Sequence, residues 1–240
     1  MKLHLIDDLP LFGVCDDMAG MEKLLRDRID HLSRTIPAQV SYIDFAEFQS
    51  LWESTAGGAP ATALVVGTRP QLLAARLPHT SRGSAVVAVH PQRKHGAGGE
   101  TAAVEVVEDL AGLPLATGPL AVLDDVMASG KTVVSVLSSL LPASWHFPVS
   151  VRTVLATREA IDLVETEFPQ VNVVSQIVAD YAPVKEGTTI FLWDLLFGTL
   201  GGRPFLSRTD LLLPFFGGDL TALFSIREEV NATHGWQVLS

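Results

Sequence analysis

The sequence contains almost no cysteine: one residue, Cys15, in a chain of 240. A single cysteine excludes an intramolecular disulfide framework and a cysteine-rich zinc site. We interpret Cys15 as a small buried hydrophobe rather than a nucleophile. Stability must therefore come from an apolar core, for which 48% hydrophobic residues are ample.

Positive charge is also scarce. The chain has 17 lysine and arginine residues against 27 aspartate and glutamate residues, which gives a formal net charge of −10. Proteins that follow nucleic-acid phosphates usually present a basic face, and the sequence shows neither a basic stripe nor a helix-turn-helix segment. These absences argue against nucleic acid as a partner and against a DNA-binding repressor.

Long hydrophobic runs are missing as well. Residues 190–200, for example, are interrupted by Asp194 and Gly198, and no apolar run approaches the length of a membrane span. The N-terminus is broken by acids and a proline too early for a signal peptide. We therefore expect a cytoplasmic protein with no membrane partner.

Between residues 61 and 181 the sequence alternates short apolar runs with helical patterns. This rhythm predicts an α/β fold, an open and mainly parallel twisted sheet flanked by helices. Its expected strands cover residues 63–66, 84–89, 120–123, 149–156 and 171–179.

The chain is expected to divide into three segments. Residues 1–60 hold a helix and short strands, and we interpret them as a hood over the site or an oligomer surface. Residues 61–181 form the α/β core, and the aromatic-rich tail, residues 182–240, departs from its rhythm. In that tail the pattern predicts an edge strand over residues 188–194 and a final helix over residues 219–230.

One stretch, residues 120–132, carries the chemistry. It reads Leu-Ala-Val-Leu, then Asp124 and Asp125, then a Ser-Gly-Lys-Thr loop that opens a helix. Ligands of an open α/β sheet bind at the carboxyl ends of its strands. The loop amides, its hydroxyls and the positive end of the helix dipole suit a phosphate. The two carboxylates suit a sugar diol, or a Mg²⁺ ion held by the diol and a pyrophosphate.

This run resembles the phosphoribosyl pyrophosphate (PRPP) signature of the type I phosphoribosyltransferases. The resemblance implies that Asp124 and Asp125 bind the ribose hydroxyls, and that the 5-phosphate is bound by Ala128, Ser129, Gly130, Lys131 and Thr132. It also implies Mg²⁺ as a cofactor that reaches the protein through PRPP, with no direct protein ligand. The fold it implies is an α/β core with a small hood built from terminal segments, commonly in a homo-oligomer such as a dimer.

Two other interpretations of the same residues stay open. The Ser-Gly-Lys-Thr end is typical of an ATP-binding Walker A loop, but that motif needs a glycine where Asp125 stands. Alternatively, the run is an ordinary strand end followed by a capped helix. Two adjacent buried acids repel each other and lose solvation, which a purely structural role would not require.

A second strand end offers a pyrophosphate site. In the phosphoribosyltransferases a loop after an early core strand binds pyrophosphate through amides and a basic residue. Thr68 and Arg69, which follow Gly67, resemble that loop, although the family's usual pair of small residues is not evident. The alternative is that Arg69 caps a turn.

The segment 90–100 is the most basic and glycine-rich stretch of this acidic chain. Such a composition suits a mobile flap over an anionic substrate. It lies where the family carries its flexible loop, so the resemblance places Arg93, Lys94 or His95 on the pyrophosphate. A solvated surface loop is the alternative, and His90 with His95 lacks a third metal ligand nearby.

Together these features predict an enzyme that transfers ribose 5-phosphate from PRPP to a nitrogenous acceptor and releases pyrophosphate. Ala128 stands where the 6-oxopurine members of the family place an aspartate, and nothing in the tail identifies the acceptor. Two alternatives remain: a regulator that senses PRPP without catalysis, and an enzyme that hydrolyses or phosphorolyses a ribose 5-phosphate substrate.

Overall fold

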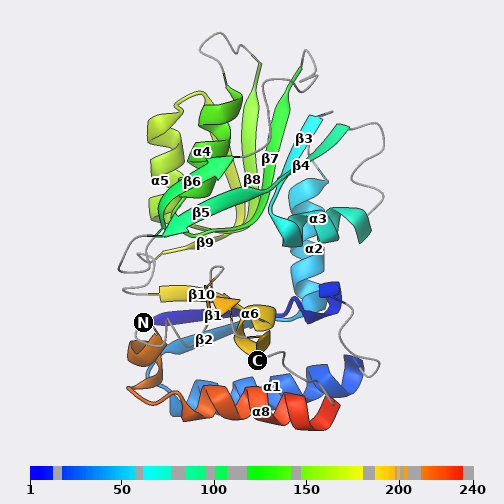
Figure 1. Cartoon of the computed structure of the whole chain (residues 1–240), viewed down its shortest axis with the longest axis vertical. Helices are drawn as coiled ribbons and strands as arrows, with labels where there is room; N and C mark the ends of the chain where they lie inside the picture. The colour runs from blue at the N-terminus through cyan, green and yellow to red at the C-terminus, as the bar shows by residue number, and fades with distance from the viewer. Residues whose placement is uncertain are drawn as a thin grey trace. The chain divides into compact units, whose positions relative to one another are not determined.

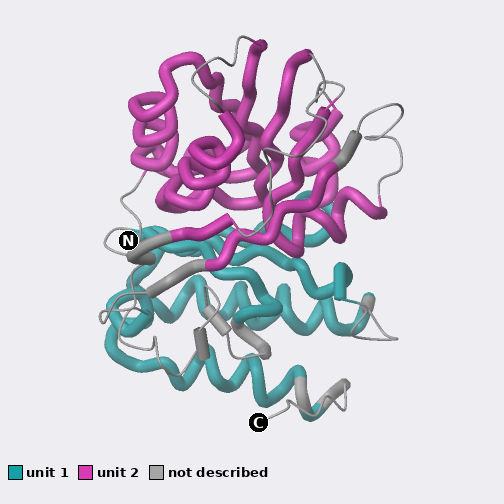
Figure 2. The backbone as a smooth tube through the Cα atoms, turned by 45° about the horizontal axis from the view of Figure 1, so that its top comes forward, with its two compact units in different colours: residues 1–48, 183–240 teal, residues 49–182 magenta. Residues whose placement is uncertain are grey.

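The computed structural model divides the chain into two compact units (Figure 2): residues 1–48 with 183–240, and residues 49–182. We describe each unit by itself. The residues that the structure describes are 1–12, 18–57, 62–76, 85–95, 101–106, 118–141, 147–180, 187–197, 199–200, 203–204 and 212–234. Within these ranges, the model contains no helix with the length and hydrophobicity that a membrane crossing requires.

The unit of residues 49–182 is built on a five-stranded parallel sheet (Figure 1). This confirms the predicted α/β class with a mainly parallel sheet and flanking helices. The strand order across the sheet is β4-β3-β7-β8-β9, and the bounds are β3 Thr62–Val66, β4 Ala85–Val89, β7 Leu120–Met127, β8 Val149–Thr157 and β9 Val171–Ala179.

One face of this sheet is covered by α4 (Lys131–Leu140) and α5 (Arg158–Glu167). Both helices place apolar residues at helical spacing, and these form one cluster with the strand residues Val122 and Val151. The helix residues in the cluster are Val133, Val136, Leu137, Leu140, Ala160, Ile161 and Val164. Because each fully buried aliphatic side chain contributes about 1.5–3 kcal/mol, this layer fixes the sheet that carries the acid pair.

The next residue along β8 after Val151 meets a different element, α2 (Phe45–Ala56). Arg152 donates from Nη1 to the carbonyl oxygen of Thr55 at 2.9 Å. Consecutive strand residues point to opposite faces, so the end of α2 lies on the face opposite α4 and α5. A further helix, α3 (Thr68–Arg76), begins two residues after β3.

A two-stranded antiparallel hairpin follows β4 and consists of β5 (Pro91–His95) and β6 (Thr101–Val106). It contacts α4, where the Ser135 hydroxyl donates to the carbonyl oxygen of Val104 at 2.8 Å. The sequence analysis assigned Arg93, Lys94 and His95 to a loop. That assignment is wrong as local structure, because these three residues form the second half of β5.

The other unit is organised around a three-stranded parallel sheet of order β10-β1-β2. The strands are β1 (Lys2–Ile6), β2 (Gln39–Ile43) and β10 (Gly187–Phe191). The edge strand predicted over residues 188–194 ends at Phe191, and α6 (Leu192–Phe197) takes over. The remaining elements are the 3-10 helices η1 Leu9–Phe12 and η5 Leu213–Phe216, the short strands β11 Thr199–Leu200 and β12 Arg203–Pro204, and the helices α1 Met18–Thr35 and α8 Thr221–His234.

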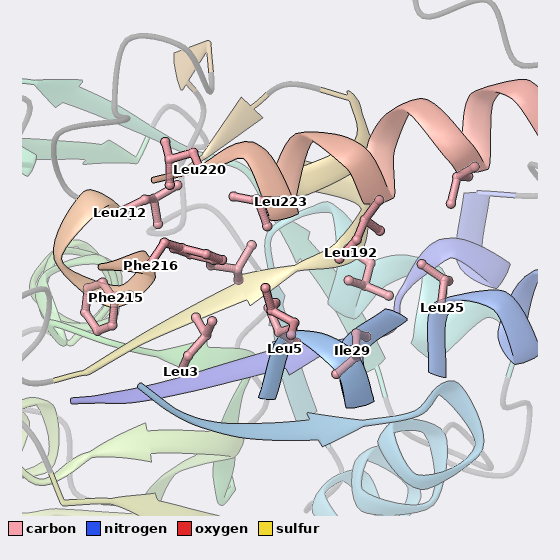
Figure 3. Close-up of a cluster of buried hydrophobic side chains, with 14 of the residues drawn as sticks. Leu3, Leu5, Leu25, Ile29, Leu192, Leu212, Phe215, Phe216, Leu220 and Leu223 are labelled. Atoms are coloured by element: carbon pink, nitrogen blue, oxygen red, sulfur yellow. The ribbon is translucent and has the colours of Figure 1, made fainter. Parts of the chain in front are cut away.

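Side chains from both ends of the chain form the core of this unit (Figure 3). Leu3 and Leu5 of β1 and Leu25 of α1 lie in one buried cluster with Phe215 and Leu223. Most aromatic residues of the tail that the structure describes are therefore core. Trp193, which is half-buried, stacks on Phe12 with ring centroids 4.1 Å apart.

Candidate functional site

The strand order of the five-stranded sheet reverses between β3 and β7. The chain forms β3 first and β4 beside it, then crosses back to place β7, β8 and β9 on the other side. Ligands of doubly wound sheets bind outside the carboxyl ends of the strands at such a switch point. Val65 pairs with Leu123, so the loop after β3 and the aspartates of β7 lie at adjacent strand ends.

Asp124 and Asp125 are both buried, with exposed fractions of 6% and 9%. A carboxylate oxygen of Asp124 accepts from the amide of Asp125 at 2.9 Å, and one of Asp125 accepts from the amide of Val126 at 2.7 Å. These bonds hold the carboxylates in place but do not neutralise them. The described residues contain no cluster of three or more histidine, cysteine, aspartate or glutamate residues that could hold a metal ion.

The acid pair coincides with an irregularity in the sheet. The pairing of β7 with β8 passes from Asp124–Thr153 to Val126–Leu155 and skips the pair between them. Before this point Val122 packs with α4 and α5, whereas Val126 packs with Leu155 in a separate cluster. The register of the two strands is the same before and after this point, but the regular alternation of faces is interrupted at Asp125.

The loop after β7 leads directly into the N-terminus of α4. Gly130 is the N-cap residue, and the structure shows no side-chain hydrogen bond that caps the helix there. The first amides of a helix have no intrahelical partner, and they carry the positive end of the helix dipole. This terminus therefore has the properties of an anion site, with Ser129 and Thr132 half-buried and Ala128 and Lys131 exposed beside it.

Gly130 is required by its surroundings. Its φ of 71° lies in the left-handed region. A Cβ at this position would lie 2.9 Å from the carbonyl oxygen of Ala160 in the first turn of α5. The phosphate-binding loop predicted from the sequence is thus pressed against α5, at a distance that only glycine allows.

Two threonines of β8, which the sequence analysis missed, bind main-chain carbonyl oxygens of the site through their hydroxyls. The Thr153 hydroxyl shares its proton between the carbonyl oxygens of Asp125 at 2.9 Å and Leu155 at 3.0 Å, and the Thr157 hydroxyl donates to the carbonyl oxygen of Ala128 at 2.6 Å. Both are buried. The available signal was two threonines in the second half of a strand whose other residues there are apolar.

The predicted pyrophosphate loop lies at the adjacent strand end. Gly67 has a φ of 88°, and its amide donates to the carbonyl oxygen of Val89 at 2.9 Å. Thr68, which is exposed, and Arg69, which is half-buried, then begin α3. The structure therefore brings this loop to the same sheet edge as the acid pair. Its role in pyrophosphate binding stays a prediction.

The hairpin that carries Arg93, Lys94 and His95 starts at this edge too, since β5 follows the carboxyl end of β4 after one residue. Contact with pyrophosphate stays a prediction for these three residues. Cys15 lies outside the described residues.

No protein-family model matches the sequence, and no curated protein matches it. Solved structures do match. A hypothetical protein from Neisseria gonorrhoeae with bound ppGpp is 16% identical, with 62% of this chain and 86% of that chain covered and a TM-score of 0.42. Orotate phosphoribosyltransferase from Aeropyrum pernix is 21% identical, with 56% and 71% covered and a TM-score of 0.36.

The xanthine-guanine-hypoxanthine phosphoribosyltransferase of Helicobacter pylori is 14% identical, with 80% of this chain and 93% of that chain covered and a TM-score of 0.38. Similarity at this level does not establish a shared activity. The function therefore follows from the chain's own residues at the β3–β7 switch point.

Proposed function

We propose that this protein is a phosphoribosyltransferase that transfers ribose 5-phosphate from PRPP to a nitrogenous acceptor. The observation that carries the proposal is the pairing of two groups at one switch point: the buried aspartates at the end of β7, and the N-terminus of α4 five residues further on. The carboxylates fit the ribose diol, and the helix terminus fits the 5-phosphate. PRPP carries both groups at opposite ends of one ring.

The reaction breaks the bond between the anomeric carbon and pyrophosphate, forms a carbon–nitrogen bond, and releases the proton of the acceptor nitrogen. Asp124 and Asp125 would hold the two hydroxyls, and the loop from Ala128 to Thr132 would hold the phosphate. The ring is then fixed at both ends, which orients the anomeric carbon for displacement. The amide of Thr68 and the cation of Arg69 would stabilise the departing pyrophosphate.

Mg²⁺ fits this donor set. The substrate's diol and pyrophosphate would supply the oxygen ligands that a hard divalent cation prefers, and the two carboxylates would hold the diol in place for it. When bound, the ion neutralises charge on the leaving group. Asp124 and Asp125 act here mainly through the hydroxyls that they hold.

Calorimetric titration of PRPP with Mg²⁺ tests the proposal, with ATP and Mg²⁺ as the control ligand. We expect PRPP to bind to the wild type, and binding to be lost in the double variant Asp124→Asn with Asp125→Asn while the fold persists. Binding of ATP without PRPP would overturn the proposal in favour of nucleotide binding.

Turnover then separates catalysis from sensing. Pyrophosphate release is measured with a panel of nitrogenous acceptors. Release that depends on an acceptor supports the transferase, whereas PRPP binding without release under any condition indicates a regulator. Product formation from ribose 5-phosphate substrates without PRPP indicates the hydrolase or phosphorylase.

A further inference from the structure

We infer that Thr157 is a positioning residue that shapes the anion-binding loop between β7 and α4. It is the last residue of β8, and 1% of its surface is exposed. It therefore does not bind the ligand itself. The inference rests on the proposed function only in naming the bound anion as the 5-phosphate of a sugar.

The Thr157 hydroxyl makes two hydrogen bonds that join the loop to α5. It donates to the carbonyl oxygen of Ala128 at 2.6 Å, and it accepts from the amide of Ala160 at 3.1 Å. The second bond is the N-cap of α5. One hydroxyl thus fixes the first residue of the loop to the first turn of the neighbouring helix.

The first of these bonds determines the orientation of the peptide group between Ala128 and Ser129. The peptide after Ala128 is trans, as are all those of the described residues. In a trans peptide the carbonyl and the next N–H point in opposite directions. With the Ala128 carbonyl directed to Thr157, the Ser129 amide is directed away from β8. Without this bond the carbonyl oxygen could turn toward the anion and repel it.

The other side of the loop is fixed by contact rather than by a hydrogen bond. The α-carbon of Gly130 approaches the carbonyl oxygen of Ala160 so closely that a Cβ would lie 2.9 Å from it. Ala160 is also the residue whose amide Thr157 accepts. The loop is therefore seated on the first turn of α5 at both Ala128 and Gly130, and Thr157 connects the two points.

Substitution of Thr157 by valine, serine and cysteine tests this role. Valine keeps the shape and removes the donor, serine keeps the donor, and cysteine is a weak donor of similar size. Thr55→Val is the matched control, because Thr55 is another buried threonine of this unit, whose hydroxyl donates to the Leu51 carbonyl of its own helix at 2.8 Å. The ligands are inorganic phosphate, and PRPP with Mg²⁺.

We expect Thr157→Val to weaken phosphate and PRPP binding about tenfold, which is the effect of losing one buried hydrogen bond and leaving its acceptor unsatisfied. Serine should restore affinity to within about twofold, cysteine should lie between, and Thr55→Val should bind as the wild type does. The urea midpoints show whether folding and binding change separately. If the valine variant does not fold, the cysteine and serine variants still give the graded series.

The two proposals fail in different ways. Wild-type affinity in Thr157→Val, or an equal loss in Thr157→Val and Thr55→Val, overturns the positioning role and leaves PRPP binding intact. A wild type that binds phosphate but not PRPP, with the phosphate affinity still sensitive to Thr157, overturns the phosphoribosyltransferase and leaves the positioning role. Binding of neither ligand by the wild type overturns both.

Discussion

Each of the two units contains a central parallel strand that runs from apolar residues into two aspartates. In one sheet β1 ends before Asp7 and Asp8, and in the other β7 contains Asp124 and Asp125. All four are buried. The same local pattern therefore occurs twice, and what surrounds each pair differs.

The first pair is used for structure. Asp7 accepts from the amide of Leu9 at 3.1 Å and from the Tyr42 hydroxyl of β2 at 3.4 Å. Asp8 accepts from the amide of Trp193, in the first turn of α6, at 2.8 Å. The strand β2 and the helix that follows β10 are thus linked to these carboxylates, and the apolar 3-10 helix η1 follows them in the chain.

The second pair accepts from the amides of the next residue along the chain, and a glycine loop with an uncapped helix follows. An Asp-Asp pair after an apolar strand is therefore not a site by itself. The five residues that come next decide whether the strand end receives a ligand.

The largest expected effect is on PRPP affinity, and it should distinguish the two pairs when each is replaced by asparagine. Asp124→Asn with Asp125→Asn should lower PRPP affinity about a thousandfold, or about 4 kcal/mol, because charge-assisted hydrogen bonds to the diol are lost. Asp7→Asn with Asp8→Asn should change it less than about threefold. Calorimetry in the presence of Mg²⁺ measures both. Equal losses would show that the first pair also takes part in binding.

A pH titration of stability should expose the structural pair. Burial, the largest cause, raises the pKa of Asp7 to about 6. The unfolded carboxyl titrates near 3.9, so the unfolded state loses its proton first. The contribution of Asp7 to stability is then highest below about pH 4, falls between about pH 4 and 6, and stays lower by about 3 kcal/mol above that range.

Asp7→Asn removes this dependence. Its side chain can still accept from Leu9 and contact the Tyr42 hydroxyl, so we expect stabilisation of up to about 3 kcal/mol at pH 8 and little change at pH 4. Urea unfolding at the two pH values measures it. An equal change at both would mean that the Asp7 carboxyl keeps an ordinary pKa.

Two glycines with nearly the same φ allow a comparison of the rigidity of the two units. Gly130 has a φ of 71° and Gly217 a φ of 67°, so alanine would be in the left-handed region at both. At Gly217 the nearest atom to a new Cβ is a ring carbon of Pro37 at 3.5 Å, whereas at Gly130 it is the Ala160 carbonyl oxygen at 2.9 Å. Gly217→Ala should cost about 1 kcal/mol and Gly130→Ala about 2 kcal/mol more.

Thermal unfolding of both variants measures this difference, and phosphate titration of Gly130→Ala should show weakened binding. Equal costs would mean that the loop can move away from α5, which would contradict the fixed seat inferred for it.

Sequence reasoning found most of the five-stranded sheet because β4 is a continuous apolar run, β3 and β7 contain such runs, and β8 and β9 are rich in valine and other β-branched residues. Residues 171–179 were predicted with the bounds that the structure shows. The β5–β6 hairpin was not found, since Arg93 and Lys94 give it no apolar alternation. The order of the strands within each sheet could not be predicted either, because pairs such as Leu5 with Ile190 join residues far apart in the chain.

In the candidate site, the sequence predicted the residues that we propose bind the ligand, but not the residues that hold their loop in place. Asp124, Asp125 and the loop belong to one contiguous motif, whereas Thr157 lies on the neighbouring strand β8 and bonds through its hydroxyl to the main chain of Ala128. A threonine at a strand end is common, and its partner Ala128 has no side-chain signal. Asp7 with Asp8 shows the opposite problem. This pair has the same sequence pattern as Asp124 with Asp125, and only the fold shows that the two pairs are used differently.

The smallest expected effect on stability distinguishes Asp7 from Asp44, two aspartates that follow neighbouring strands of one sheet. Asp44 follows β2 as Asp7 follows β1, but its pKa is lowered, chiefly because it accepts from the amide of Glu47, at 2.8 Å, and caps α2. Its contribution is therefore present above about pH 4 and is lost as the pH falls through the lowered pKa, the reverse of Asp7. Asp44→Ala should cost about 1 kcal/mol at pH 6 and less at pH 3. Asp44→Asn, which keeps the cap, should cost less than half of that by urea unfolding, and an equal cost would assign the effect to charge, through Arg26, rather than to capping.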